Sequence, residues 1–399
     1  MSPVALPRRF YAVAVCAGIA TGNLWVGIPL FASGSGRSAG FAGALLAAAT
    51  VATAAGALAA NPLLARLRLP RELLAVALAV TGAGHFLLIV PAELGLVAGA
   101  LVAGVATGLF WVGSHVLLAT RSGSSGSEQD FLAHYALFTV GAVAGAALTG
   151  FGASAVQWAG ISQAASVRLT FALGLAGAIS ALVLWLPCVA RGREPAPVME
   201  RLTLGLPARG LAVQLPDLLL VSAHGLMLPL APLVLADDFG FSPFAIGLVA
   251  AAVSVAKIGG VFTARAVVRS SGARTAILSF LAVASVLSLF LGVAGSAALF
   301  VVALLGIALV TLGVWPLIVD AALARIEPDS RGGVTVAWHA REYAVIALAT
   351  ALAGWLLQSF RDPTPLFVLA ALLLAFSVAA STAVLRRPVH LPQATACEA

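Results

Sequence analysis

Charge is rare inside the long apolar runs of this sequence, and four ionisable side chains there are the first candidates for chemistry: Lys257, His339, Arg341 and Glu342. At helical spacing His339, Glu342 and Tyr343 share one face, because residues three and four apart are neighbours on a helix. A carboxyl group withdrawn from water can hold a proton at neutral pH. Glu342 is therefore a candidate proton carrier, with His339 beside it. A structural ion pair of Glu342 with Arg341 or Lys257 and an exposed helix end are the alternatives.

Lys257 is the only lysine of the chain and lies 15 residues past Ser242. On a helix that separation is about 22 Å, deep in a hydrocarbon core of about 30 Å. Lys257 could anchor an anionic or zwitterionic ligand, or it could snorkel to the nearest headgroups. Near the end of the predicted helix 297–323, Asp320 is a candidate gate contact for Arg341 or a solvated interfacial carboxylate.

The remaining reactive residue types form no recognisable catalytic or metal motif. No phosphate loop, zinc spacing or catalytic triad is present, so we expect neither an enzyme nor a cofactor. Three cysteines, Cys16, Cys188 and Cys397, lack the pattern of a disulfide framework. Five of the six histidines lie in five different apolar runs, a scatter that argues against one metal site: His85, His115, His134, His224 and His339.

The composition places the chain in a membrane. Of 399 residues, 61% are apolar and only 9% are charged, against about 25% charged in soluble domains. The apolar runs are about 20 residues or longer, which favours membrane helices over barrel strands. We predict twelve spans, at 10–32, 38–60, 72–91, 94–119, 131–156, 166–190, 211–236, 242–267, 274–294, 297–323, 333–359 and 363–385.

The arginines predict the orientation. With both termini in the cytoplasm, 17 of the 22 basic residues lie in cytoplasmic segments and three in outer loops, the other two being Lys257 and Arg341. Such an excess of positive charge is typical of the cytoplasmic side. We therefore expect an inner-membrane protein, and the pI near 10.3 does not indicate a nucleic-acid partner.

The two halves of the sequence repeat each other. Ala20 and Gly22 recur 203 residues later, Gly43 and Trp111 recur 204 residues later, and His134 recurs 205 residues later. A displacement so constant predicts two equivalent six-helix bundles, at 1–190 and 211–399, joined by a cytoplasmic connector at 191–210. The second bundle ends in a short cytoplasmic tail. Fused membrane repeats are typical of transporters, in which one half rocks against the other.

Twelve helices in a six-plus-six repeat resemble the major facilitator superfamily over essentially the whole chain. The family's loop motif after helix two, G-x-L-x-D-R-x-G-R-[RK], keeps Gly56 and Leu58 here. Ala60 and Asn61 replace its Asp and Arg, and Ala264 again replaces the Asp in the second copy. The fourth predicted helix lacks the Arg common in proton-coupled exporters, and the fifth lacks their Gly-Pro element.

The resemblance implies a secondary transporter whose helices one, four, seven and ten line a central cavity. Six polar or aromatic residues would then face the substrate beside Lys257: Asn23, Trp25, Trp111, His115, His224 and Trp315. We expect a monomer that moves a small organic compound, with proton-coupled export preferred. The alternatives are uptake of an organic anion and a non-transporting sensor or lipid-handling protein of the same fold. Protons and membrane lipids are the other expected partners.

Overall fold

The structure, a computed structural model, describes residues 8–67, 70–121, 127–190, 208–325 and 331–386 of the chain, and every regular element in these ranges is an α-helix. In chain order the helices are α1 (Arg8–Gly34), α2 (Ala39–Leu67), α3 (Pro70–Ile89), α4 (Glu93–Arg121), α5 (Ser127–Trp158), α6 (Gln163–Ala190), α7 (Ala208–Met227), α8 (Ala231–Asp237), α9 (Pro243–Gly292), α10 (Ala297–Leu323), α11 (Arg331–Phe360) and α12 (Thr364–Leu385).

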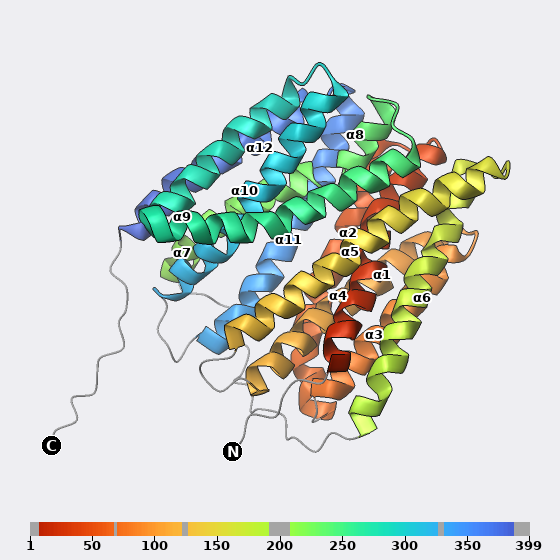
Figure 1. The fold of residues 1–399 in the computed structure, drawn as a ribbon, viewed down its shortest axis with the longest axis horizontal. Coiled ribbons are helices and arrows are strands. Elements are labelled where there is room, and N and C mark those ends of the chain that lie inside the picture. Colours follow the sequence, from red (N-terminus) through yellow and green to blue (C-terminus); the bar gives the residue numbers. More distant parts are fainter. Residues whose placement is uncertain (1–7, 68–69, 122–126, 191–207, 326–330, 387–399) are drawn as a thin grey trace.

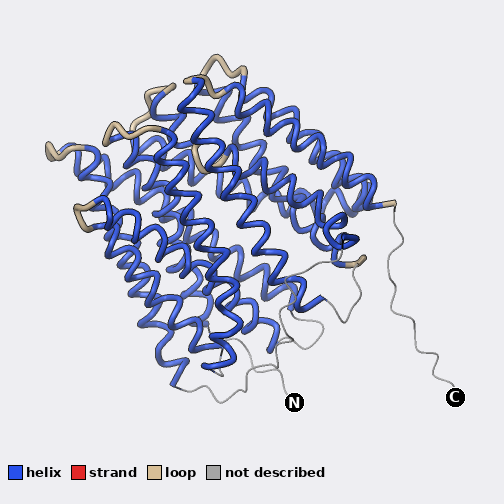
Figure 2. The backbone as a smooth tube through the Cα atoms, turned by 180° about the vertical axis from the view of Figure 1, so that it is seen from behind, coloured by secondary structure: helices blue, strands red, loops and turns tan. Residues whose placement is uncertain are grey.

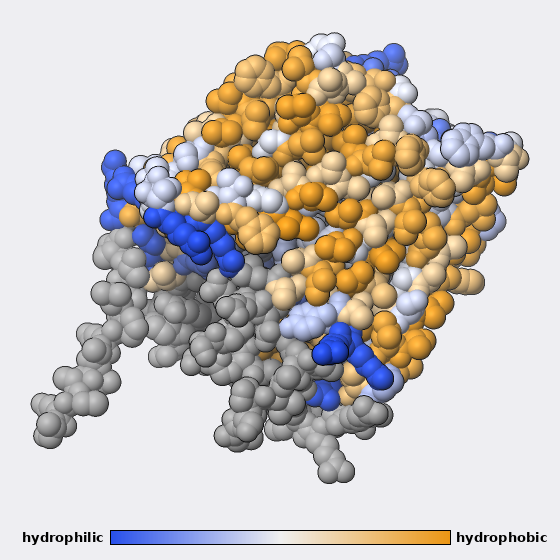
Figure 3. Space-filling view, in the orientation of Figure 1, coloured by the Kyte–Doolittle hydropathy of each residue, from blue (hydrophilic) through white to orange (hydrophobic). Residues whose placement is uncertain are grey.

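The helices stand side by side, and most of the described loops gather at one end of the molecule (Figures 1 and 2). Between the two ends the surface is largely apolar, and hydrophilic residues collect near the ends (Figure 3). Eleven helical segments in the described ranges are long and apolar enough to cross a membrane, with α7 and α8 together forming one of them. The prediction of a multi-pass helical membrane protein is confirmed.

The count of twelve crossings depends on α9, which covers nearly all of both predicted spans 242–267 and 274–294. This helix has 50 residues and would be about 75 Å long if straight, more than twice the thickness of a bilayer core. Gly272 interrupts it with φ 81° and ψ 157°, values that favour glycine. Figure 1 shows α9 reaching a corner of the molecule and turning back.

The break between α7 and α8 has a different cause. Pro229 and Pro232 follow Met227 closely, and proline removes a backbone donor and clashes with the preceding turn. The resulting irregular backbone lines an internal cavity at Leu228 and Pro229. Irregular backbone at membrane depth is tolerated where it lines a cavity or is buried in protein.

The helices pack in two groups with two long contacts between them. Helices α1 to α6 pack mainly on one another, and so do α7 to α12, whereas α2 lies along α11 and α5 lies along α9. We call the end of the bundle that carries the turn residues Gly36, Gly160 and Gly240 the sealed face. The opposite end, which carries Arg66 and Arg269, is the arginine-rich face.

Glycines bring the two groups into contact near the sealed face. A Cβ atom on Gly43 would lie 2.7 Å from Cα of Gly354, and one on Gly150 would lie 2.8 Å from Cα of Gly247. Gly247 and Gly354 lie 204 residues beyond Gly43 and Gly150, so the two contacts are copies of each other. Small residues at such positions allow close backbone approach. Two further hydrogen bonds join the groups nearby, from Ser33 to Asp237 and from the Phe244 amide to Ser154.

Candidate functional site: a cavity with a lone lysine and a buried carboxyl cluster

A cavity of about 380 Å³ lies between the two groups of helices. Its walls come from α1, α4 and α5 on one side and from α7 to α11 on the other, with the aromatic rings of Trp25, Trp111, Tyr135 and Phe138 among them. The volume falls within the range of small-molecule sites, which is about 300 to 1,000 Å³. An apolar, aromatic wall of this size suits a small organic molecule.

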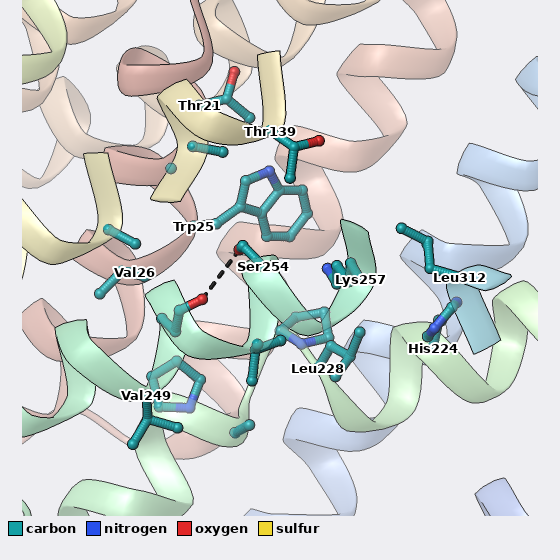
Figure 4. Close-up of a pocket in the computed structure, with 18 of the residues that line it drawn as sticks. Thr21, Trp25, Val26, Thr139, His224, Leu228, Val249, Ser254, Lys257 and Leu312 are labelled. Atoms are coloured by element: carbon teal, nitrogen blue, oxygen red, sulfur yellow. Dashed lines mark hydrogen bonds between the residues drawn. The ribbon is translucent and has the colours of Figure 1, made fainter. Parts of the chain in front are cut away.

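Lys257 lies in the wall of this cavity, on the part of α9 that precedes Gly272, with Trp25 and His224 nearby (Figure 4). In the described part of the chain no hydrogen bond or ion pair engages its ammonium group, and no carboxylate is among the residues that line the cavity. Lys257 therefore lines a cavity that could hold the anionic ligand of the first sequence-based interpretation. An ammonium ion without a partner away from bulk water attracts an anionic group.

The neighbouring wall is held by short hydrogen bonds within the membrane helices. His224 Nε2 lies 2.6 Å from the hydroxyl of Thr311, whose Oγ1 also donates to the carbonyl of Ile307 at 2.6 Å. The Ser254 hydroxyl donates to a carbonyl of its own helix (Figure 4). None of these bonds involves Lys257, whose ammonium group has no protein partner among the described residues.

A second cavity, of about 220 Å³, adjoins the first one. The two cavities share Trp111, Tyr135, His224, Leu312 and Ile346 as wall residues. Among the residues that line only the second cavity, five carry polar or aromatic side chains, which are His115, Trp315, His339, Glu342 and Tyr343. The predicted common face of His339, Glu342 and Tyr343 therefore lines one cavity.

Glu342 is almost fully buried and makes two hydrogen bonds. The Trp315 indole donates to Oε1 at 3.1 Å, and His339 Nδ1 lies 2.6 Å from Oε2. Only 6% of the Glu342 side chain is exposed, against 23% for His339. A proton from the cavity therefore reaches the imidazole more readily than the carboxyl group.

The structure adds one residue that the sequence interpretation missed. Asp217 of α7 is completely buried, and its Oδ2 accepts a hydrogen bond of 2.6 Å from the Trp338 indole. Asp217 is a close neighbour of Glu342. The sequence contained the signal, because Asp217 is a carboxyl group within the predicted span 211–236. Glu342 was selected because it also lies within a predicted span. Glu342 is therefore not the only carboxylate buried in this part of the protein.

Arg341 points away from this cavity, as its helical position predicts, and donates to the Gln214 side chain of α7 at 3.2 Å. Gln214 in turn donates to the carbonyl of Trp338 at 3.2 Å, so α7 and α11 are joined at two levels. Asp320 is exposed near the end of α10, outside the carboxyl cluster. Asp320 is also absent from the walls of both cavities.

Asn23 is the predicted cavity residue whose placement is wrong. It is completely buried among α1, α5 and α6, where its amide donates to the hydroxyl of Thr149 and the carbonyl of Thr170. It is absent from the walls of both cavities. The helical register alone did not show this, because a polar amide can be satisfied by neighbouring helices as readily as by a ligand.

The other residues predicted to face the substrate line one or both cavities. His115 of α4 and His339 of α11 meet at a ring separation of 5.8 Å, which brings the two groups of helices together beside the second cavity. Trp111 packs against Phe138 with a ring separation of 4.7 Å, whereas its repeat partner Trp315 bonds to Glu342. The repeated tryptophans therefore have different partners.

The remaining span histidines lie elsewhere. His85 is buried, and its ring nitrogens lie 3.0 Å from the carbonyls of Thr81 and Ala20. His134 stacks on Phe10 at 4.6 Å. In the described ranges no group of three metal-ligating side chains is close enough to hold an ion.

Comparison with known proteins finds similar structures but no similar sequences. No family model and no curated protein matches the sequence. Among solved structures, a POT family transporter in complex with a thioalcohol-conjugated peptide superposes with a TM-score of 0.74 at 11% identity, covering 94% of each chain. The xylose transporter XylE from E. coli, in a partially occluded inward-open conformation, gives 0.72 at 13% identity, covering 93% of this chain and 97% of that one.

A third structure carries the family name. The major facilitator superfamily transporter FucP in the outward conformation superposes with a TM-score of 0.66 at 12% identity, covering 94% of this chain and 97% of that one. The chain therefore has the fold of major facilitator transporters, as the sequence resemblance predicted. The POT family transporter binds a conjugated peptide and XylE is a xylose transporter, so the fold does not select a substrate.

Proposed function

We propose that the protein is a secondary transporter that moves a small organic solute by alternating access. The observation that carries the proposal is the cavity between two repeated groups of helices, which are packed together at the sealed face. A substrate held there is exposed to the other side when the glycine contacts open. The proposed units are two six-helix bundles, at 1–190 and 211–399, joined by 191–210.

We further propose that the substrate carries a negative charge and an apolar body. Lys257 supplies the counter-charge, and the aromatic walls supply the apolar surface. An anionic substrate was predicted for the alternative function, uptake of an organic anion. The same cavity chemistry is equally compatible with proton-coupled export of an anion. The direction of transport can be determined by comparing the accumulation of substrate in right-side-out and inside-out vesicles under the same proton gradient.

Alternating access has a test that needs no known substrate. On a background without Cys16, Cys188 and Cys397, Ser254→Cys should react with a membrane-impermeant thiol reagent from both sides of the membrane. Ser254 lines the cavity, so each conformation should expose it to one side. A sensor held in one state should react from one side only, which would contradict transport. Ser271→Cys, on the exposed turn of α9, is the matched control and should react from one side only.

We propose that α9 crosses the membrane twice, which gives twelve crossings with both termini in the cytoplasm. On the same cysteine-free background, Ser271→Cys should be labelled from the cytoplasmic side only, and Gly295→Cys from the outside only. Ser271 is next to the non-helical Gly272, and Gly295 follows the end of α9. Labelling of both positions from the same side would contradict two crossings.

A further inference from the structure

Asp217 is a carboxyl group in an unusual setting. It is completely buried in α7, between helices that cross the membrane. Its Oδ2 accepts the Trp338 indole N–H, but Oδ1 accepts no hydrogen bond from an N–H or hydroxyl donor in the described part of the chain. An ionised carboxylate with an unsatisfied oxygen is very costly in such surroundings, and a group in that position is stabilised by keeping its proton.

The group next to Asp217 is a second carboxyl. Trp338 and Glu342 are one helical turn apart on α11, and the two acids are close enough to interact side chain to side chain. Two carboxylates in contact repel each other strongly away from water, so such a pair retains one proton between them. The indoles of Trp338 and Trp315 each satisfy one oxygen of the pair.

The other groups around the pair decide where this proton lies. On α11, His339 bonds to Glu342 Oε2 at 2.6 Å and Tyr343 lies beside it, while Arg341 is engaged with Gln214 of α7. The histidine can balance the charge of Glu342, whereas no cation is bonded to Asp217 among the described residues. The neutral acid of the pair is therefore Asp217.

Groups on the remaining neighbouring helices do not reverse this assignment. His115 of α4 faces His339 across the second cavity, and Tyr135 of α5 lies in the same wall. From α10 the Trp315 indole donates to Glu342, and on α12 the hydroxyl of Ser377 donates to the carbonyl of Pro216. Lys257 of α9 belongs to the first cavity.

The first half of the chain has no such pair. Moving back by the repeat displacements of 203 and 205 residues, Ala14 and Leu137 occupy the positions of Asp217 and Glu342. His134, the counterpart of His339, stacks there on Phe10 and Phe110. The same helix packing is thus achieved without carboxyl groups, so the fold does not require the pair.

We propose that Asp217 and Glu342 form a proton-binding site in which a single proton is shared, loaded from the second cavity through His339. The coupling ion that binds there is a proton. The exchange balances because protonated His339 passes its Nδ1 proton to Glu342 Oε2, and the neutral imidazole then takes a proton from hydronium in the cavity, which leaves a neutral water molecule. The role of this pair in coupling rests on the proposed function. The binding of a proton by the pair does not depend on transport.

Infrared difference spectroscopy of the purified full chain in lipid tests the occupancy directly. At pH 7 we expect a protonated-carboxyl C=O band that shifts in D₂O. Asp217→Asn should eliminate the band, and Glu342→Gln should weaken it by at least half, because the amide removes the repelling charge and offers an N–H to Asp217. Asp238→Asn, which changes an exposed carboxylate at the sealed face, should leave the band unchanged.

The assignment is overturned if the wild type lacks the band or if the band persists unchanged in either Asp217→Asn or Glu342→Gln. Should Asp217→Asn fail to fold, Trp338→Phe removes the indole donor and retains an aromatic ring, so the band should change frequency. Proton-driven accumulation and substrate counterflow in proteoliposomes form the second measurement. Asp217→Asn should lose accumulation and keep counterflow. Absence of counterflow in the wild type would refute transport, while the infrared result would still decide the proton site.

Discussion

Replacing Lys257 by Met is expected to remove the selectivity of the cavity for anions. Losing a charge-assisted contact of about 2 kcal/mol should weaken the binding of an organic carboxylate about 30-fold. Benzoate, benzamide and benzylamine share a ring and differ in charge. In the wild type, benzoate should raise the melting temperature most, and in Lys257→Met the three compounds should have similar, small effects.

The same substitution has a second expected result, without any ligand. Lys257 has no ion-pair partner among the described residues, and a desolvated, unpaired cation destabilises the folded state. Methionine has a similar length and no charge, so the ligand-free melting temperature should stay level or rise. Lys257→Arg is the control and should keep the preference for benzoate. An unchanged preference in Lys257→Met would show that Lys257 does not bind the anion.

Glu342→Gln is expected to uncouple transport from the proton gradient. Glutamine mimics the protonated carboxyl but cannot release a proton, so the variant should lose uphill accumulation of a carboxylate substrate almost completely. Counterflow of the same substrate should continue, because exchange needs no net movement of protons. Both quantities are measured in proteoliposomes, with and without an imposed pH gradient.

The neighbours of Glu342 provide graded comparisons. His339→Gln should slow accumulation without abolishing it, since it removes the group between the cavity and Glu342 but leaves the carboxyl pair. Asp238→Asn should behave like the wild type because Asp238 is exposed at the sealed face and is absent from the walls of both cavities. Uphill accumulation by Glu342→Gln at the normal rate would exclude Glu342 as the proton carrier.

The membrane location, the helical class and the resemblance to major facilitator transporters all followed from the sequence, for a simple reason. In lipid, runs so long and apolar can form little other than helices. The repeat can be recognised because identical residues recur at displacements of 203 to 205 residues. The repeat even has a direct structural expression, because the contacts Gly43–Gly354 and Gly150–Gly247 are related by it. Lys257 and Glu342 were identifiable because charge inside such runs is costly.

The partners of those charges were decided by the tertiary structure alone. Whether Lys257 meets lipid headgroups or a cavity, and whether Asn23 meets a ligand or Thr149, depends on how helices far apart in sequence are rotated against one another. The Asp217–Glu342 pair joins residues from α7 and α11 for the same reason. An apolar sequence specifies that a helix is buried in the membrane, but it encodes only weakly which face meets which neighbour, since lipid and protein offer similar apolar surroundings. Only the packed helices bring two distant carboxyl groups to one place.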